Sequence, residues 1–457
     1  MKIFLKRVFH PVGQGAFYSE QIYSGNNVFE MVFDCGNDRG HNKKKLKEYS
    51  PKLFDYFEHR IINNKDKVWK IDLLFISHFH ADHISFLITY KGQYQVKNLI
   101  IPVLSEEQKS LLLIDVLLKK IDIDFQAYYQ LLTDTPKFFG EDCHIIKINT
   151  DESNTDEDKN KNKDLVIVTN EGKVESRGEL LKTFNPIFKL QYYDNKLIIY
   201  HPDPQSHYYF PIWLYLPYDF IKYFCCSDYK RKISTFFIKT KLTSELLMDV
   251  KDITEILKHI EKKLKNIEKK LKNKNKNIDI KPLNYLKAQY MKINRDLNKI
   301  CLGVFSGPVP FHLYSYLRNL DLKKYNKIFK EQSCLYTGDI PFNATKEINC
   351  VEEVRKLIIE SYASLSKLYS ESKDYDFENN FDWHIGTLQI PHHGSGDNYS
   401  DDFFKLKFIN AVICFGSNNK YYHPNGELLL KLLEKNKIIR DVSNNYTKKY
   451  ARRFKIY

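Results

Sequence analysis

The sequence predicts an α+β protein whose fold is interrupted by a large insertion. Apolar runs of strand length end directly in polar, metal-ligating residues, most clearly at residues 71–77 and 335–339. Between such runs, apolar residues three or four positions apart indicate helices. The stretch between these two runs is far longer than a fold built around them requires, so additional elements lie there. At 457 residues, 43% of them apolar, the chain can form two or three structural units around a substantial core.

We expect residues 1–150 to form the first half of this fold. Its elements follow in chain order: strands and turns within 1–36, a basic stretch at 41–47, a helix around 52–62, a buried strand at 71–77, a helix at 84–90, a core strand at 97–103 and a helix at 106–120. Residues 301–457 are expected to form the second half, which includes the short apolar strand that ends at Asp339.

Residues 151–300 are expected to form the insertion. Residues 151–164 are polar throughout and cannot bury an apolar face, so they predict a loop. Residues 165–245 are rich in Tyr, Phe, Ile and Pro, which indicates short strands and turns beside the core. In residues 251–298, two segments with helical apolar periodicity flank an Asn- and Lys-rich break, a pattern that predicts a helical hairpin.

The chain is strongly basic, with a formal net charge of +14. Residues 251–276 alone contain ten lysines against four acidic residues. Such a field attracts polyanions, and nucleic acid is the partner that it favours. Two alternatives stay open for the basic hairpin: its lysines form a solvated helix face, or its apolar stripe is a site for self-association or for another protein.

The composition indicates a cytoplasmic protein without membrane segments. No stretch of 18 or more residues is apolar and uncharged. The first ten residues alternate like a strand and lack the apolar stretch and cleavage site of a secretory signal. The eight cysteines are scattered, with no Cys-x-x-Cys pair, which favours reduced thiols over disulfides.

The most informative motif is His78-Phe-His80-Ala-Asp82-His83, which follows the predicted strand at 71–77. Imidazole together with carboxylate suits zinc or a similar divalent ion. His78 and His80 are two apart in an extended segment and face the same side, so both can bind one ion. Asp82 and His83 lie where the chain turns into the next helix and can serve a second ion. Two ions about 3.5 to 4 Å apart can lower the pKa of a bridging water from about 15.7 towards 7, which is hydrolytic chemistry.

Four residues from one turn cannot enclose two cations, and the sequence offers further ligands at other strand ends. The strand that ends at Asp339 delivers a carboxylate that could bridge both ions, and a later apolar segment ends in His392 and His393. Asp34 ends another predicted strand, where it is well placed to orient a ligand imidazole from behind.

These motifs resemble those of the metallo-β-lactamase fold superfamily, and within it the branch typified by the hydrolase domain of ComEC-type competence proteins. The resemblance spans residues 8–90 and 300–425 and rests on six motifs in the family's order: Val12-Gly-Gln-Gly15, Phe33-Asp-Cys-Gly36, Ser77-His-Phe-His-Ala-Asp-His-Ile84, Thr337-Gly-Asp339, Pro391-His-His-Gly-Ser395 and Gly416-Ser-Asn-Asn-Lys-Tyr-Tyr-His-Pro424. The chain departs from the family pattern at Ala16 and Ser85. No histidine between residues 84 and 338 stands at a strand end to serve as the separate ligand that many members have.

The resemblance implies an αββα sandwich with two metal ions at one edge, between the sheets. By position, His78 and His80 would hold one ion, and Asp82 and His83 the other. Asp339 would bridge the ions. The implied ligand set is completed by one or both members of the pair His392 and His393.

The resemblance also implies residues that act beside the ligands. Asp82 and His423 are the expected catalytic residues, since His423 matches a late histidine that can bind substrate phosphate or transfer a proton. Ser395 and Asn419 lie in the last two motifs and are expected to bind substrate.

The leading hypothesis is a di-metal phosphodiesterase, specifically a nuclease that cuts DNA or RNA through a metal-bound hydroxide. Its cofactors would be two divalent ions, zinc or, as the alternative, manganese. Two other functions stay open. One is hydrolysis of a small phosphodiester, such as a cyclic nucleotide or a phosphocholine ester. The other is a role as an assembly component that recruits a partner through residues 251–298.

Overall fold

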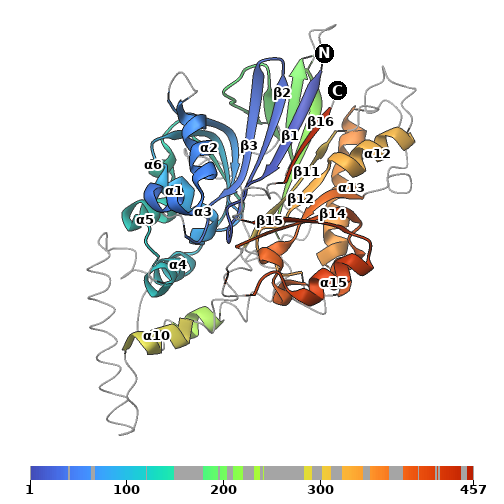
Figure 1. The fold of residues 1–457 in the computed structure, drawn as a ribbon. Helices are drawn as coiled ribbons and strands as arrows, with labels where there is room; N and C mark the ends of the chain where they lie inside the picture. The colour runs from blue at the N-terminus through green and yellow to red at the C-terminus, as the bar shows by residue number, and fades with distance from the viewer. Residues whose placement is uncertain are drawn as a thin grey trace, which may run out of the picture.

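The computed structural model describes residues 2–39, 42–62, 67–119, 121–148, 179–193, 196–202, 209–219, 231–236, 240, 282–290, 301–309, 322–342, 350–369, 384–399, 401–416, 419, 422–443 and 450–455. Within these residues the strands form two mixed β-sheets, of seven and nine strands, and helices accompany both sheets (Figure 1). The chain is therefore a mixed α/β protein, as the strand and helix patterns predict.

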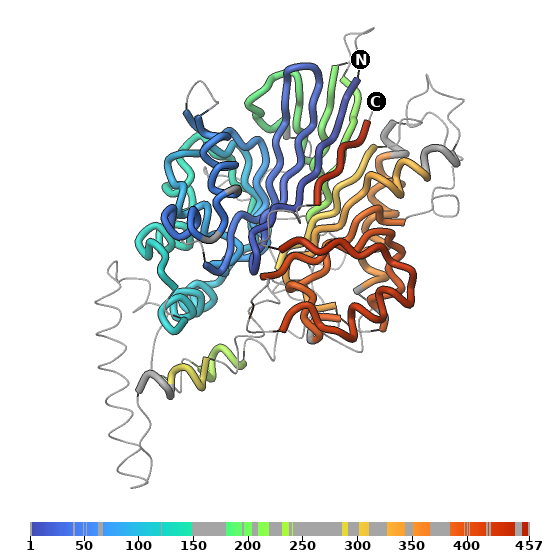
Figure 2. Tube along the Cα trace, viewed as in Figure 1, coloured from blue at the N-terminus to red at the C-terminus, as the bar shows by residue number. Residues whose placement is uncertain are grey.

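The first sheet contains the N-terminal strands in the order β16-β1-β2-β3-β4-β5-β6. Strands β3 to β6 are parallel, and the other neighbours are antiparallel. Strand β16 pairs with β1, so the two ends of the chain lie side by side (Figure 2). The strands are β1 (Ile3–Phe9), β2 (Phe17–Ser24), β3 (Asn27–Cys35), β4 (Trp69–Phe75), β5 (Tyr94–Pro102), β6 (His144–Ile148) and β16 (Tyr450–Lys455).

The second sheet has the order β15-β14-β13-β12-β11-β10-β9-β8-β7. Strands β12 to β15 are parallel, whereas β7 to β12 pair antiparallel. The strands are β7 (Glu179–Leu181), β8 (Lys189–Tyr193), β9 (Lys196–Pro202), β10 (Tyr209–Asp219), β11 (Leu302–Pro308), β12 (Cys334–Tyr336), β13 (Ile385–Gln389), β14 (Phe408–Phe415) and β15 (Ile438–Ser443).

Each sheet buries apolar side chains on both faces. Along β3, Phe29, Met31 and Phe33 point into a core shared by the two sheets, whereas Val32 points to helices on the outer face. This alternation follows from the period of two along a strand. Three apolar clusters result, one between the sheets and one beneath the helices of each sheet. The order of the layers is therefore helices, sheet, sheet, helices (Figure 1).

The helices belong to one or the other outer layer. Those packed on the first sheet are α1 (Lys43–Tyr49), α2 (Pro51–Ile62), α3 (Ala81–Thr89), α4 (Glu106–Lys119), α5 (Phe125–Thr133) and α6 (Thr135–Phe139). Those packed on the second sheet are α12 (Leu322–Gln332), α13 (Cys350–Tyr369) and α15 (Gly426–Glu434). Helix α10 (Pro282–Tyr290) packs against α4 and buries Leu286 and Tyr290 in the first outer layer.

Most predicted elements of the first half coincide with observed ones. Strands β4 and β5 overlap the predicted strands, and helices α2, α3 and α4 overlap the predicted helices. Helix α1 was not predicted, because its sequence shows only a basic stretch. Its start is set locally, since Oδ1 of Asn42 accepts a hydrogen bond from the backbone nitrogen of Lys45 at 2.9 Å.

The structure differs from the prediction in residues 179–219. We expected short strands beside the core, and strands are present, but these strands, β7 to β10, continue the second sheet. Leu214 and Leu216 face the helices, while Trp213 and Tyr215 face the first sheet. Because β10 pairs with β11 from Trp213 to Asp219, these residues are an integral part of the second sheet.

The predicted hairpin at 251–298 and the predicted loop at 151–164 fall largely outside the described residues. The exception is α10, which lies within 251–298 and agrees with the helix expected after the Asn- and Lys-rich break. In the part of the chain that the structure describes, no helix is long and apolar enough to cross a bilayer.

Candidate metal centre

The first half of the candidate centre lies where the carboxyl ends of β3 and β4 meet the start of α3. Strands β3 and β4 are parallel, so these ends lie at the same edge of the sheet. Asp34 stands near the end of β3, and Ser77 and His78 follow β4. Gly36 lets the chain after β3 approach α3 closely, because a Cβ atom there would lie 2.5 Å from the backbone nitrogen of Ile84.

The second half comes from the carboxyl ends of β12 and β13, which are also parallel. Asp339 follows β12 in a turn with Gly338 at φ 54°, and a Cβ atom at Gly338 would lie 2.5 Å from Sγ of Cys301. His392 and His393 follow β13 with φ 46° and 56°. Non-glycine residues rarely adopt this left-handed conformation, and those that do are often held in it at functional sites.

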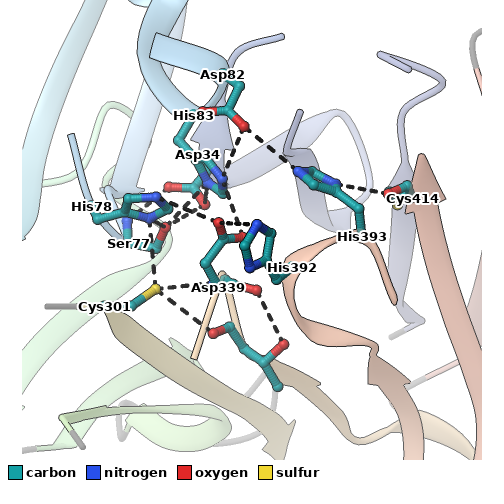
Figure 3. Close-up of polar contacts among 12 residues, drawn as sticks. Asp34, Ser77, His78, Asp82, His83, Cys301, Asp339, His392, His393 and Cys414 are labelled. Atoms are coloured by element: carbon teal, nitrogen blue, oxygen red, sulfur yellow. Dashed lines mark hydrogen bonds and ion pairs between the residues drawn. The ribbon is translucent and has the colours of Figure 1, made fainter. Parts of the chain in front are cut away.

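Two groups of three side chains each bring metal-ligating atoms within 4.8 Å of one another (Figure 3). The groups are His78, His83 and Asp339, and Asp82, His83 and His393. Nε2 of His83 lies 3.4 Å from Oδ1 of Asp339 and 3.8 Å from Oδ2 of Asp82. The ring of His83 therefore stands between two carboxylates, one in the first turn of α3 and the other just after β12.

The other imidazoles point to the same two carboxylates. Nε2 of His78 and Nε2 of His392 each lie 3.8 Å from Oδ2 of Asp339. Nε2 of His393 lies 3.6 Å from Oδ2 of Asp82. The structure thus brings together most of the predicted ligands, although they follow three different strands, β4, β12 and β13.

Hydrogen bonds at Nδ1 determine which imidazole nitrogen can bind a cation. Nδ1 of His83 donates to Oδ2 of Asp34 at 2.8 Å, and Nδ1 of His393 donates to the carbonyl oxygen of Cys414 at 2.9 Å. An ionised carboxylate and a carbonyl oxygen can only accept, so the proton of each ring is on Nδ1. The lone pair of each ring is then on Nε2, which faces the centre.

The ring of His392 is oriented in the same way by Asn398. Nδ2 of Asn398 donates to the carbonyl oxygen of Asp339 at 3.0 Å, which orients the amide. Oδ1 of Asn398 then accepts a hydrogen bond from Nδ1 of His392 at 3.0 Å. At the other end of the centre, Oγ of Ser77 donates to Asp34 at 2.7 Å and can accept from Nδ1 of His78 at 3.0 Å.

The side chains fit a metal ion. At the centre, four buried Nε2 atoms have no hydrogen-bond partner within the described residues, and a buried polar atom left in this way costs free energy. These atoms belong to His78, His80, His83 and His393. Imidazole nitrogen and carboxylate oxygen are common metal ligands, so these groups could hold a metal ion.

The charges of the centre shift the pKa values of its members. Burial would lower the pKa of His83, but the carboxylates of Asp339, Asp34 and Asp82 hold it well above its usual range. Burial would raise the pKa of Asp339, but the imidazoles of His392 and His83 hold it well below its usual range. The carboxylate is therefore ionised at neutral pH, and a cation would compete with the proton on His83.

His80 lies beside His78 but outside both groups. The two ring centroids are 4.9 Å apart, and His80 is the residue that precedes the first turn of α3. Burial lowers the pKa of His80, and the carboxylate that acts most strongly on it is Asp115 on α4. The pairing of His78 with His80 on one ion stays a prediction, since the close group that contains His78 consists of His78, His83 and Asp339.

The late loop lies next to His392. The ring centroids of His423 and His392 are 5.7 Å apart. The side chain of Asn419 bonds the backbone of its own loop, since Oδ1 accepts from His423 at 2.9 Å and Nδ2 donates to Gly416 at 2.7 Å. Ser395 is buried, and its backbone nitrogen donates to the carbonyl oxygen of His392 at 2.9 Å. Substrate contacts of Asn419 and Ser395 stay predictions.

Three residues of the centre received no role from the sequence: Ser77, Cys301 and Asn398. Ser77 stands inside the histidine motif, at the strand end, and its backbone nitrogen also donates to Asp34 at 2.7 Å. Its position was a usable signal. Cys301 and Asn398 carry no such signal, because only the approach of distant segments brings them to the centre.

No protein-family model matches this chain, and no curated protein is similar to it in sequence.

Proposed function

We propose that this protein is a metal-dependent hydrolase of the metallo-β-lactamase type that cleaves phosphodiester bonds in nucleic acid. The observation that carries the proposal is the convergence of buried imidazole Nε2 atoms with the carboxylates of Asp82 and Asp339. The position of this centre, at one edge of two packed sheets with helices outside, supports the proposed superfamily.

The number of ligands limits how two ions would be held. Nδ1 of His83 is bonded to Asp34, so this ring has one lone pair and can serve one ion. We assign His83 to the ion held with Asp82 and His393, the second observed group. The other ion would be held by His78, Asp339 and the nearby His80. The buried Nε2 of His80 lacks a hydrogen-bond partner within the described residues. Zinc suits this donor set best.

Divalent ions bound there would supply Lewis acidity and would ionise a water molecule near neutral pH. The residues of the chain would orient the ligands, keep their charges and contact the substrate. Asp34 and Ser77 orient two imidazoles, and the carboxylates of Asp82 and Asp339 stay ionised. His423, next to His392 and half-buried, is placed to bind a phosphate oxygen or to transfer a proton.

The substrate class follows from charge. The formal net charge of +14 attracts polyanions such as DNA and RNA, and salt weakens this attraction strongly. A small diester gains little from so extended a field. Nucleic acid is therefore the substrate that we prefer.

The test is an assay of protein stripped of metal by a chelator and then reloaded with zinc, manganese or magnesium. Labelled single- and double-stranded DNA and RNA are compared with a small chromogenic diester. We expect metal-dependent cleavage of at least one polymer, and the rate should fall as salt rises. Turnover of the small diester alone, without dependence on salt, would exclude the nucleic-acid substrate. Absence of hydrolysis with every metal and substrate would exclude the hydrolase.

Replacement of one carboxylate tests the centre itself. Asp82→Asn removes the charge that faces His83 and His393, so kcat/KM should fall at least about 100-fold, which corresponds to about 2.7 kcal/mol of transition-state stabilisation. Asp55→Asn, at an exposed position of α2, is the matched control and should change neither activity nor metal content. Full activity in a folded Asp82→Asn protein would refute the assignment.

A further inference from the structure

The thiol of Cys301 touches both halves of the candidate centre. Sγ lies 3.6 Å from Nδ1 of His78 and accepts a hydrogen bond from the backbone nitrogen of Asp339 at 3.2 Å (Figure 3). His78 follows a strand of the first sheet, and Asp339 follows a strand of the second. Only 1% of the cysteine is exposed to solvent, so these contacts are not shared with bulk water.

The surroundings of the sulfur suit a protonated thiol better than a metal-bound thiolate. Sγ lies 3.9 Å from the carbonyl oxygen of Leu302 and 3.8 Å from that of Thr337, and a thiol can donate to either. A thiolate, the form that binds metals, would face these two oxygens without a proton between them. The sulfur also faces Nδ1 of His78, whereas the ring presents Nε2 to Asp339. Cys301 therefore stands behind the centre.

The local packing leaves little freedom around this sulfur. Cys301 directly precedes β11, whose first residue, Leu302, donates from its backbone nitrogen to the carbonyl oxygen of Ser77 at 2.8 Å. Gly338 lies so close that a Cβ atom there would be 2.5 Å from Sγ. The turn that carries Asp339 is thus held against the thiol on one side and against Ser77 on the other.

We propose that Cys301 is a positioning residue that sets the separation of His78 and Asp339, and with it the affinity and coordination geometry of the metal centre. This inference rests on the metal centre of the proposed function and not on the identity of the substrate.

Two substitutions separate the polar contacts of the thiol from its volume. Cys301→Ser keeps a hydroxyl group that can accept a hydrogen bond from the backbone nitrogen of Asp339 and donate one to a carbonyl oxygen. Cys301→Ala removes both hydrogen bonds, and both substitutions reduce the volume of the side chain by a similar amount. Metal-free proteins are titrated with Co²⁺, whose visible absorption reports coordination geometry, and with Zn²⁺ in competition. We expect Cys301→Ala to bind both ions about 10- to 100-fold more weakly, with an altered Co²⁺ spectrum. Cys301→Ser should bind them as the original protein does.

Cys143→Ala is the matched control. Cys143 is as buried as Cys301, but it precedes β6, at the edge of the first sheet opposite to Asp34 and Ser77. This variant should keep the original affinity and spectrum. Thermal unfolding checks each fold, and Cys301→Val, which fills the space without hydrogen bonds, replaces Cys301→Ala if the latter unfolds.

The outcomes separate the two proposals. If the original protein binds neither ion, the metal centre fails and this inference fails with it. If the original protein binds metal and Cys301→Ala binds it equally well, only the positioning role is overturned. Equal weakening in Cys301→Ser and Cys301→Ala would overturn it too, because the volume of the sulfur would then be the cause.

Discussion

The orientation of the His83 imidazole is fixed by an acceptor behind it, the carboxylate of Asp34. Asp34 is fully buried and accepts three hydrogen bonds, two from Ser77 and one from His83. Asp34 itself has a positive φ of 53°, an unusual conformation for a non-glycine residue. Such backbone strain persists only where the surrounding structure holds it. Here the strained backbone directs the carboxylate of Asp34 to Ser77 and His83.

We predict that Asp34→Asn weakens metal binding about 10- to 100-fold, a common result when the group behind a ligand imidazole is altered. An amide has one acceptor oxygen where the carboxylate has two. The side-chain N–H group of the new asparagine would then face either Ser77 or His83. Nδ1–H of His83 would lose its acceptor, or it would share the one remaining oxygen with Ser77. Competition with a chromogenic chelator measures the affinity.

Asp72→Asn is the control for this substitution. Asp72 is also a buried aspartate that accepts two backbone hydrogen bonds, but they come from Glu30 and Phe184, away from the ligands. The metal affinity of the Asp72→Asn variant should equal that of the original protein. Equal affinity in Asp34→Asn as well would show that Asp34 does not orient His83.

At this scale the sequence predicts the ligands better than their supports. His78, Asp82 and His83 are neighbours in the chain, so one motif shows them together. Asp339 and His393 are distant from that motif, but each stands at a strand end, a signal that could be recognised. Contacts such as those of Cys301 depend on how segments over 200 residues apart approach each other, which no local pattern encodes.

Among the elements, the parallel strands explain why the candidate ligands meet. The carboxyl ends of β3 and β4, and those of β12 and β13, each lie at a single edge, so residues that follow the strands are brought together. Helix α3 adds Asp82 in its first turn, where a carboxylate also interacts favourably with the helix dipole. This part of the fold was predictable, because apolar runs that end in polar residues have a direct structural meaning.

The position of β7 to β10 was not predictable in the same way. Strand β10 is buried on both faces, so its sequence is continuously apolar and lacks the alternation that would show which layer it faces. Pro211 and Pro217 also suggested turns, yet β10 contains both, with an irregular register after Pro211. The content of Tyr, Phe and Ile indicated strands here, but tertiary contacts determine which strands pair with one another.

The contacts of Asp72 give these elements a pH dependence. Asp72, on β4, accepts from the backbone nitrogen of Glu30 on β3 at 2.9 Å and from that of Phe184, before β8, at 2.7 Å. Burial raises the pKa of Asp72 to about 6, although both hydrogen bonds oppose the change. The folded state therefore keeps this proton at pH values where the unfolded chain has lost it.

We predict that this group stabilises the fold below about pH 4 relative to neutral pH, and that the stabilisation is lost as pH rises through about 6. A shift of about two pH units corresponds to about 3 kcal/mol. Asp72→Asn cannot titrate, so the difference in free energy of unfolding between the original protein and the variant should shrink by up to about 3 kcal/mol from pH 4 to 7. Urea unfolding across this range measures the difference. A constant difference would show that Asp72 has an ordinary pKa.

For the whole molecule, the decisive feature is the packing of the two sheets, because each supplies only part of the centre. An ion pair lies between them. Nε of Arg7 donates to Oε1 of Glu20 at 2.6 Å, and its Nη1 donates to the carbonyl oxygen of Gln332 at 2.8 Å. Ser306 and Tyr336, both in the second sheet, donate to the carboxylate of Glu20 at 2.8 Å. The sequence did not reveal this pair, since charged residues in strands usually face solvent.

Loss of the guanidinium should therefore destabilise the whole fold. Arg7→Met leaves the buried carboxylate of Glu20 without its cation, and we expect the free energy of unfolding to fall by about 3 to 5 kcal/mol. Lys109→Met, which removes a cation paired to the exposed Glu106, should cost less than about 1 kcal/mol. Urea unfolding with a chelator present measures both, so that bound metal does not contribute. Adding Glu20→Gln to Arg7→Met removes the unpaired charge and should recover part of the loss. If the double variant is instead less stable than the sum of its single substitutions predicts, Arg7 contributes through its packing and its bond to Gln332, and not through the charge of Glu20.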